Sequence, residues 1–195
     1  MRRAEVTRNT AETQVCVTLD LDGEGKGGIS TGIGFFDHMM QLFLSHSRYD
    51  LTLEVKGDTQ VDFHHSVEDA GIALGKAFAK ALGDKGGITR YVDMILPMDE
   101  TLMMCAVDIS GRAYLGYEVV TYTDKVGQFD CELVKEFLLA FVRNAEITLH
   151  FKMLAGENSH HILEAVFKAL ARVLRKATDI DERLKGAIPS SKGAL

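Results

Sequence analysis

Polar and apolar residues alternate along residues 15–21, which is the pattern of a half-buried β-strand. Val15, Val17, Leu19 and Leu21 are apolar, and the residues between them are polar or small, so one face of the strand is apolar and the other is not. After this strand the pattern predicts a glycine-rich turn or mobile loop at 22–32, a helix at 37–47, a strand at 49–55 and a helix at 66–82.

The second part of the chain has the same layout. Its pattern predicts strands at 101–109 and near 113–121, a helix at 130–143, a strand at 147–152 and a helix at 160–177. Residues 188–195, IPSSKGAL, form a short polar tail. We expect this tail to be flexible until a ligand binds it.

Similar segments recur in the two parts in the same order. The matching pairs are 11–23 with 99–111 at an offset of 88 residues, and 51–55 with 147–151 and 64–74 with 160–170 at an offset of 96. The first pair places Glu12 on Glu100. The second part is therefore eight residues longer, and the extra residues lie between Gly111 and Ile147, most simply around 122–128.

These matches indicate an ancient duplication. We expect one domain, residues 1–195, made of two similar halves of about 1–88 and 89–195. Antiparallel strands with two helices per half predict an α+β fold, in which two mainly antiparallel sheets enclose the helices between them.

Composition and charge narrow the class of protein. The chain has 195 residues, of which 46% are hydrophobic, enough for a substantial core. Its net charge of −6 argues against a nucleic-acid-binding surface. The start of the chain has no apolar stretch of a signal peptide, and no run approaches the roughly 20 apolar residues that a membrane span needs. The three cysteines have no CxxC spacing, as in a reduced protein, so we expect a cytoplasmic location.

The pattern HHxxE occurs once in each half. Its members are His64, His65 and Glu68, and then His160, His161 and Glu164. On a helix, consecutive residues point about 100° apart, so the two imidazoles of a pair diverge and each reaches a different ion. Imidazole with carboxylate is a common ligand set for Zn, Mn, Fe, Co or Ni. The duplication therefore predicts two metal sites, built from both halves or from neighbouring subunits. The alternative is that these histidines cap helices or lie on the surface.

The other histidines carry weaker signals. His46 and His150 stand alone, which favours structural roles. His38, in FFDHM, fits a core position or a contact at a helix end as well as a metal site.

Five segments, in this order, resemble the imidazoleglycerol-phosphate dehydratase family of histidine biosynthesis. They are FFDHM at 35–39, HHSVEDAGIALGKA at 64–77, DISGRAYLGYE at 108–118, SHHILEAVFKALARVLRKA at 159–177 and IPSSKG at 188–193. The resemblance covers essentially the whole chain. It implies a carbon–oxygen lyase, a fold of the kind found in the second domain of ribosomal protein S5, and an assembly of 24 subunits.

The resemblance also implies two manganese ions at each active centre. It carries metal ligation onto His38, His64, His65, Glu68, Glu136, His160, His161 and Glu164. One partition gives His38, His65, Glu68 and His161 to one ion, and His64, Glu136, His160 and Glu164 to the other. Position 136 departs from the family pattern, because several members have histidine there. A carboxylate can replace imidazole on manganese, so we expect the site to survive this change.

The implied reaction removes water from imidazole glycerol phosphate and gives imidazole acetol phosphate. The proton that leaves is not next to a carbonyl group, so the substrate's own ring must accept electrons, as an imidazolate between two cations. The resemblance points to Glu12 as the base, with His65 and Glu68 as further catalytic residues. Without the family resemblance, the residue pattern favours a solvated carboxylate at the start of the first strand for Glu12. Its duplicate, Glu100, suggests that the position can be structural.

A phosphate group requires fixed cations and hydrogen-bond donors. The family's phosphate-binding positions correspond to Arg90, Arg112, Lys168, Ser190, Ser191 and Lys192. Arginine suits bidentate contact with phosphate and lysine acts as a point charge. Lys168 follows Glu164 by four residues, so both project from nearly the same helical face. We expect the IPSSKG tail to close over the phosphate.

Two other functions fit the HHxxE pattern by itself. One is a different di-metal enzyme, a phosphatase or amidohydrolase, which would release phosphate or an amine. The other is a non-catalytic metal-binding shell, which would take up metal but have no use for Glu12 or the phosphate-binding residues.

Overall fold

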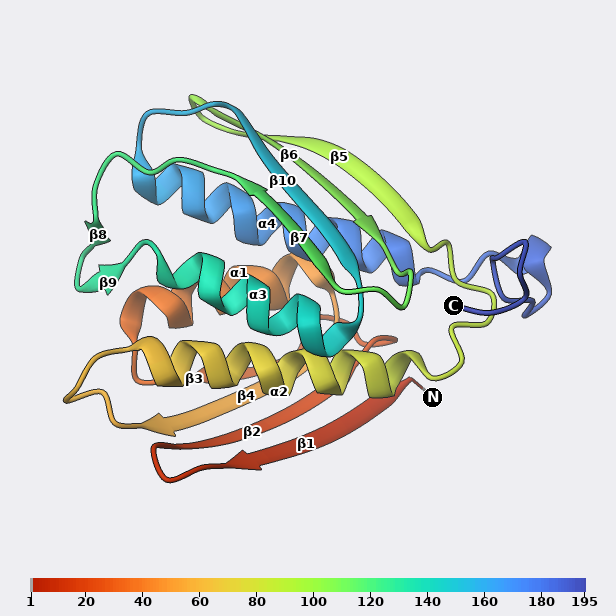
Figure 1. The fold of residues 1–195 in the computed structure, drawn as a ribbon, viewed down its shortest axis with the longest axis horizontal. Coiled ribbons are helices and arrows are strands. Elements are labelled where there is room, and N and C mark those ends of the chain that lie inside the picture. Colours follow the sequence, from red (N-terminus) through yellow and green to blue (C-terminus); the bar gives the residue numbers. More distant parts are fainter. Residues whose placement is uncertain (1) are drawn as a thin grey trace.

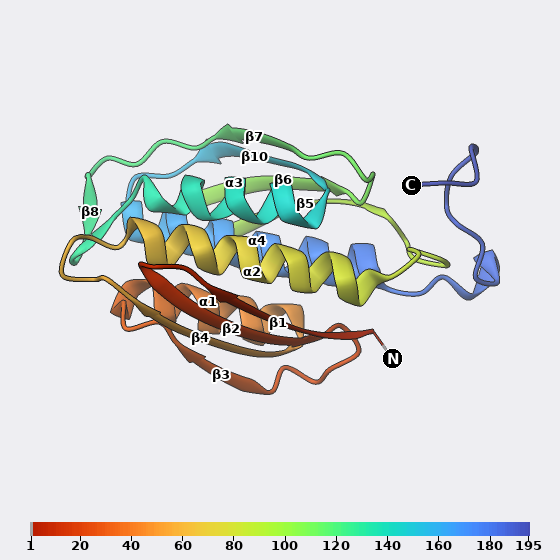
Figure 2. The same ribbon diagram turned by 60° about the horizontal axis from the view of Figure 1, so that its bottom comes forward.

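The computed structural model describes residues 2–195, in which two four-stranded sheets enclose four α-helices (Figure 1). Figure 2 shows the same layers from another side, with the helices between the sheets. The apolar faces of both sheets and of the helices meet in a shared hydrophobic core. The predicted α+β class and the position of the helices are confirmed.

The first half contributes one sheet and two helices. Its elements are β1 (Arg3–Asn9), β2 (Thr13–Asp20), β3 (Gly27–Ser30), α1 (Gly34–Ser47), β4 (Asp50–Gly57) and α2 (His64–Leu82). The strand order in the sheet is β1-β2-β4-β3, and β3 is parallel to β4. The inward residues of β2 are Val15, Val17 and Leu19, as their alternation predicts.

The second half repeats this topology and adds a hairpin. Its elements are β5 (Tyr91–Met98), β6 (Thr101–Asp108), β7 (Tyr114–Glu118), β8 (Lys125–Val126), β9 (Phe129–Asp130), α3 (Leu133–Ala145), β10 (Thr148–Ala155), α4 (Ser159–Thr178) and the 3-10 turn η1 (Glu182–Leu184). The strand order β5-β6-β10-β7 matches that of the first sheet. The β8–β9 hairpin has no counterpart in the first half, and it lies where the sequence offset places the extra residues.

Each long helix covers the sheet of its own half and packs against the short helix of the other half. Helix α2 lies on β1 and β2 and against α3, whereas α4 lies on β5 and β6 and against α1. The α2–α3 contact is close because α2 has glycine where the two backbones approach. A Cβ atom at Gly71 would lie 2.6 Å from the carbonyl oxygen of Phe137, and one at Gly75 would lie 2.6 Å from that of Phe141.

Three strands of the two four-stranded sheets differ from the expectations. The segment 22–32, expected as a loop, contains β3. The absence of a side chain at Gly27 allows β3 to lie close to β4. A Cβ atom at Gly27, where φ is 144°, would lie 1.9 Å from the carbonyl oxygen of Leu51 on β4. The edge strands β1 and β5 were not predicted, because most of their residues remain at least partly exposed and neither has a strong apolar pattern.

The four helices begin at the same end of the molecule (Figures 1 and 2). The connections from β1 to β2 and from β8 to β9 lie at this end as well. The C-terminal tail lies at the opposite end, beyond the last turn of α4. We call these the helix-start end and the tail end.

No helix in the part of the chain that the structure describes is both long and apolar enough to cross a bilayer. The three cysteines are free, with Cys105 and Cys131 buried and Cys16 exposed.

Candidate metal centre

The candidate metal ligands lie on the first two turns of the four helices, so the fold gathers them at the helix-start end. They are His38 on α1, His64, His65 and Glu68 on α2, Glu136 on α3, and His160, His161 and Glu164 on α4. The first histidine of each HHxxE pair donates its backbone N–H to a side chain two residues earlier. The Asp62 side chain accepts a hydrogen bond from the backbone N–H of His64 at 2.8 Å, and that of Asn158 accepts one from His160 at 2.9 Å.

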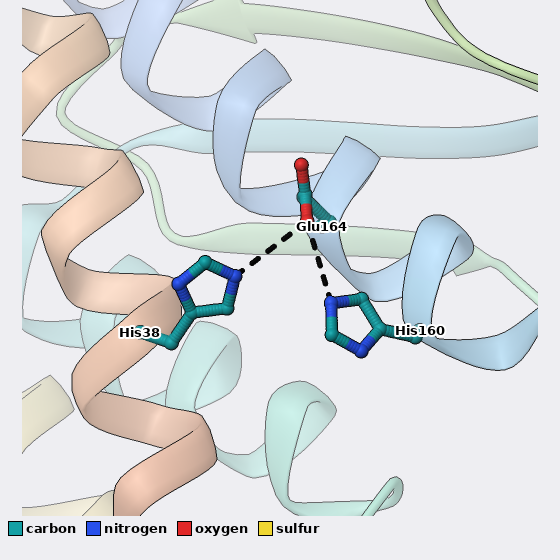
Figure 3. Close-up of side chains that lie close together, drawn as sticks. All are labelled: His38, His160 and Glu164. Atoms are coloured by element: carbon teal, nitrogen blue, oxygen red, sulfur yellow. Dashed lines mark ion pairs between the residues drawn. The ribbon is translucent and has the colours of Figure 1, made fainter.

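Three of these ligands form a compact cluster between α1 and α4 (Figure 3). The Nε2 atom of His38 lies 3.6 Å from Oε2 of Glu164, and Nε2 of His160 lies 3.4 Å from the same oxygen. One ligand atom from each residue lies within 4.8 Å of the others. The Glu164 side chain is only 10% exposed, whereas both imidazoles are more than 40% exposed. Three nitrogen and oxygen donors therefore converge on one point that solvent reaches.

The charge of Glu164 is balanced by a lysine on the next turn of α4. The Lys168 ammonium lies 2.5 Å from Oε1, the oxygen that does not face the histidines. Burial raises the pKa of Glu164, but Lys168, His38 and His160 together lower it by more, so the net pKa is below its ordinary value. The carboxylate is therefore ionised at neutral pH and can act as an anionic ligand. The shared face predicted for Glu164 and Lys168 is confirmed.

A cavity of about 540 Å³ opens beside the cluster. His38 and His160 line it together with the β3–α1 loop and the β8–β9 hairpin, including Gly127. Phe35 stacks edge-on against His160, with ring centroids 5.3 Å apart. A cavity of this size accommodates a small organic ligand. The hairpin that is unique to the second half thus supplies one wall of the candidate site.

The two histidines of each pair diverge in the same way, as helical winding predicts. The ring centroids of His64 and His65 lie 6.2 Å apart with an interplanar angle of 86°. For His160 and His161 the values are 6.2 Å and 80°. The duplicated sequence therefore produces duplicated side-chain geometry.

The second histidine of each pair directs Nδ1 towards carboxylates. Nδ1 of His65 lies 3.0 Å from Asp58 and 3.7 Å from Glu12, while Nδ1 of His161 lies 2.8 Å from Glu100. Hydrogen bonds to Asp58 and to Glu100 raise the pKa of His65 and of His161, respectively. The bond from His161, with backbone N–H groups, lowers the pKa of Glu100 to about 2. Carboxylates at Nδ1 favour the tautomer that leaves Nε2 as the metal-binding atom.

The remaining candidate ligands have no hydrogen-bonding or ionic side-chain partner within residues 2–195. They are His64, Glu68 and Glu136. Glu136 lies on α3 where His38 lies on α1: each is ten residues before the left-handed residue that ends its helix, Glu146 or Arg48. Position 136 therefore occupies the duplicate position of a cluster member.

The compact cluster does not follow the predicted partition within one chain. His160 and Glu164 were assigned to one ion and His38 to the other, yet their donor atoms converge. The partition concerns complete sites with two ions, so it stays a prediction.

The candidate phosphate-binding residues, apart from Lys168, lie at the tail end. The Arg90 N–H donates to the carbonyl oxygen of Ala177 in the last turn of α4, and its guanidinium pairs with Asp108 at 2.8 Å and donates to Pro189 O at 2.7 Å. Arg112 is exposed and follows β6 at this end. Ser190, Ser191 and Lys192 are in the tail itself. His161 is sixteen residues before Ala177 on α4, which corresponds to about 24 Å along the helix.

Asp58 and Asp69 at the helix-start end were not predicted. Asp58 bonds His65, and the buried Asp69 pairs with Arg8 at 2.8 Å and accepts a hydrogen bond from the Thr13 hydroxyl. The two contacts of Asp69 join residues that are distant in sequence, whereas Asp58 and His65 are seven residues apart. The only available signal was that each aspartate is missing from the matching position of the other half, where Leu154 and Ala165 stand.

Comparisons with known proteins show the family to which this chain belongs. Residues 31–174 match the family model of imidazoleglycerol-phosphate dehydratase. Imidazoleglycerol-phosphate dehydratase of Methylorubrum extorquens is 59% identical over 195 residues, 100% of both chains, and that of Xanthobacter autotrophicus is 55% identical over 100% of this chain and 99% of its own.

Solved structures show the same relationship. The crystal structure of imidazoleglycerol-phosphate dehydratase from Staphylococcus aureus has a TM-score of 0.84 and 40% identity, covering 92% of this chain and 99% of that one. The enzyme from Pyrococcus furiosus has a TM-score of 0.83 and 36% identity, covering 97% and 100%. This chain therefore belongs to the imidazoleglycerol-phosphate dehydratase family and is a carbon–oxygen lyase.

Proposed function

We propose that this chain converts imidazole glycerol phosphate to imidazole acetol phosphate, the dehydration step of histidine biosynthesis, with two manganese ions at each active centre. The observation that carries the proposal is the convergence of His38, His160 and Glu164 at the end of the molecule where both HHxxE pairs begin. The free cysteines and the biosynthetic role support a cytoplasmic location.

The donor set fits manganese. The described residues at the helix-start end offer imidazole nitrogens and carboxylate oxygens, a mixture that suits a divalent first-row metal. The residues that would hold the two ions are His38, His160 and Glu164 of the compact cluster together with His64, His65, Glu68, Glu136 and His161. Bound manganese supplies Lewis-acid stabilisation of negative charge on the substrate's imidazole ring.

The chain's own residues would move the protons. Glu12 lies in the turn between β1 and β2, beside His65, with its side chain 55% exposed. The Thr10 hydroxyl accepts hydrogen bonds from the N–H groups of Glu12 and Thr13, which fixes this turn. Glu12 would accept the proton from the substrate carbon. The C–O bond on the neighbouring carbon then breaks, the hydroxyl leaves as water after gaining a proton, and the enol tautomerises to the ketone.

The second histidine and the glutamate of the α2 pattern complete the catalytic group. Nδ1 of His65 is bound by Asp58 at 3.0 Å and lies 3.7 Å from Glu12. Glu68 is one turn further along α2 and is partly exposed. We assign both to binding and orientation of the reacting part of the substrate.

Phosphate binding requires a second copy of the chain. Arg90, Arg112 and the serine–lysine tail lie at the tail end, about 24 Å along α4 from His161. The substrate joins its ring to its phosphate through only three carbons, so it cannot span that distance. We infer that the helix-start end of one subunit and the tail end of another form each active centre.

The outer face of the second sheet supports such an assembly, whereas that of the first sheet is polar. The outer face of the first sheet carries polar residues such as Glu5, Thr18 and Glu54. On the second sheet, Tyr91, Ile95 and Tyr114 are each more than half exposed, with Leu102, Met104 and Ala106 between them. An apolar face of this kind is typical of a protein–protein interface. We therefore infer a homo-oligomer, with 24 subunits as the family resemblance implies.

The proposal is tested by metal analysis together with an assay on imidazole glycerol phosphate. Loaded with manganese, the wild-type protein should form imidazole acetol phosphate, whereas a di-metal hydrolase would release inorganic phosphate or an amine. Glu12→Gln removes the base, so we expect kcat to fall by about 100- to 10,000-fold while the manganese content per chain stays constant. Unchanged turnover in this variant would exclude Glu12 as the base.

A further inference from the structure

The segments before α2 and α4 correspond residue by residue, which allows the surroundings of Glu12 and Glu100 to be compared directly. Both segments lie at the offset of 96, and Asp62 and Asn158 each accept a hydrogen bond from the backbone N–H of the first histidine of the pair. Glu12 and Glu100 correspond at the offset of 88, each directly before the second strand of its half. Differences between these two glutamates therefore reflect what surrounds them.

Glu100 is held by four groups. Nδ1 of His161 lies 2.8 Å from Oε2, and Oε1 accepts hydrogen bonds from the N–H of Asn158 at 2.9 Å, the hydroxyl of Thr101 at 3.2 Å and the N–H of Glu157 at 3.3 Å. Its side chain is 32% exposed. A carboxylate with this many donors is a structural anchor between the β5–β6 turn and the start of α4.

In the first half, three of the corresponding groups have other partners. The counterpart of His161 is His65, and its Nδ1 is bound by the Asp58 side chain at 3.0 Å. The counterpart of Glu157 is Val61, and its backbone N–H donates to the backbone carbonyl oxygen of Asp58 at 2.8 Å. The Thr13 hydroxyl, counterpart of the Thr101 hydroxyl, donates to Asp69.

Neither aspartate exists in the second half. The residues at the corresponding positions are Leu154 and Ala165. The Oδ1 atom of Asp58 is buried without a hydrogen-bond partner among the residues that the structure describes. A buried polar atom without a partner is unfavourable for folding, so this oxygen does not stabilise the chain.

We propose that Asp58 and Asp69 are positioning residues that keep the Glu12 carboxylate free, because they bind the groups that would otherwise hold it as their counterparts hold Glu100. Glu12 is left 3.7 Å from His65 and 55% exposed. The inference rests on the proposed role of Glu12 as the base. It explains how one copy of a duplicated glutamate became available for proton transfer while the other became an anchor.

The decisive variant is Asp58→Leu, which gives the first half the residue of the second. We expect Glu12 to move to hydrogen-bond distance of His65 Nδ1, about 2.9 Å, in a crystal structure of the manganese-loaded protein. A Glu12 carboxylate that is hydrogen-bonded to His65 is a poorer base, so kcat should fall by about tenfold or more, with KM and manganese content per chain unchanged. In Asp58→Asn the amide oxygen still accepts a hydrogen bond from His65, so most of kcat should return.

Two further variants complete the test. Asp69→Ala should allow the Thr13 hydroxyl to donate to Glu12, again with a lower kcat. Asp69→Ala also leaves Arg8 without its ion-pair partner. The elution volume of this variant on a sizing column is therefore compared with that of the wild type to confirm folding. Asp62→Asn is the matched control: it also copies the second half but keeps an oxygen that accepts the His64 N–H, so kcat should change by less than about twofold.

The outcomes separate this inference from the proposed function. If Glu12→Gln is inactive but Glu12 keeps its position in Asp58→Leu, the inference is overturned and the assigned base remains. Loss of manganese in Asp58→Leu, with Glu12 unmoved, also overturns it, because Asp58 would then act only by supporting His65 as a ligand. If Glu12→Gln is fully active, the base assignment itself fails.

Discussion

Among single residues, the His161–Glu100 pair determines a pH dependence of stability in the metal-free protein. The folded pKa of Glu100 is about 2, below its ordinary value of 4.5. The stabilisation by its carboxylate is therefore fully present above pH 4.5 and is lost as the pH falls from 4.5 towards 2. The folded pKa of His161 is raised above 6.5, so its stabilisation is present below 6.5 and is lost as the pH rises through the raised value.

Glu100→Gln should therefore lower the free energy of unfolding most between pH 4.5 and 6.5, the interval in which both charges are present in the folded state. The difference from the wild type should shrink on both sides of this interval. Urea unfolding of the metal-free proteins at a series of pH values measures it. Glu12→Gln is the control and should show a weaker pH dependence, because Glu12 lies 3.7 Å from its histidine. A difference that does not vary with pH would contradict the assignment.

The sequence predicted much of the chemistry at this scale. The HHxxE repeat and helical winding were enough to predict diverging imidazoles, and the offset of 88 was enough to pair Glu12 with Glu100. The sequence did not predict which of these two glutamates is hydrogen-bonded to the histidine beside it. That depends on Asp58 and Asp69, whose partners come from other elements, so only the folded chain brings them together.

At the scale of elements, the approach of α2 to α3 depends on two glycines. A Cβ atom at Gly71 would lie 2.6 Å from Phe137 O and 2.9 Å from Ala140 Cβ, so Gly71→Ala must push the helices apart. We expect it to lower the free energy of unfolding of the metal-free protein by about 1–3 kcal/mol, as overpacking typically does.

Chemical denaturation measures this change, and Gly34→Ala is its control. Gly34 is also helical, but a Cβ atom there would have no heavy atom within 4 Å. Alanine favours helix over glycine by up to about 1 kcal/mol, so this variant should be as stable as the wild type or more stable. Equal effects of the two substitutions would show that helix packing does not depend on Gly71.

Glycine also explains which elements the sequence predicted poorly. In α2, strong apolar periodicity outweighed two glycines, and the helix was predicted. In 22–32 no such periodicity exists, so the glycines indicated a loop. The backbone of Gly27 instead lies against Leu51 on β4, a contact that only tertiary structure reveals. The edge strands β1 and β5 escaped prediction because half-exposed strands have weak patterns.

At the scale of the whole molecule, the separation of the two ends makes a prediction about mixed assemblies. Glu12→Gln disables the helix-start end, and Arg112→Ala disables the tail end without touching the metal ligands. Each variant alone should be inactive or nearly so. If each active centre joins the helix-start end of one subunit to the tail end of another, a mixed particle contains some centres in which both ends are intact.

Random assembly of the two variants in equal amounts gives such centres in about one case in four, so activity should recover to about a quarter of the wild-type value. The variants are mixed after manganese removal, reassembled with manganese and assayed on imidazole glycerol phosphate. Mixing two preparations of the same variant is the control and should restore nothing. If both ends of one chain served the same centre, every centre would carry one defect and the mixture would stay inactive, which would contradict the shared site.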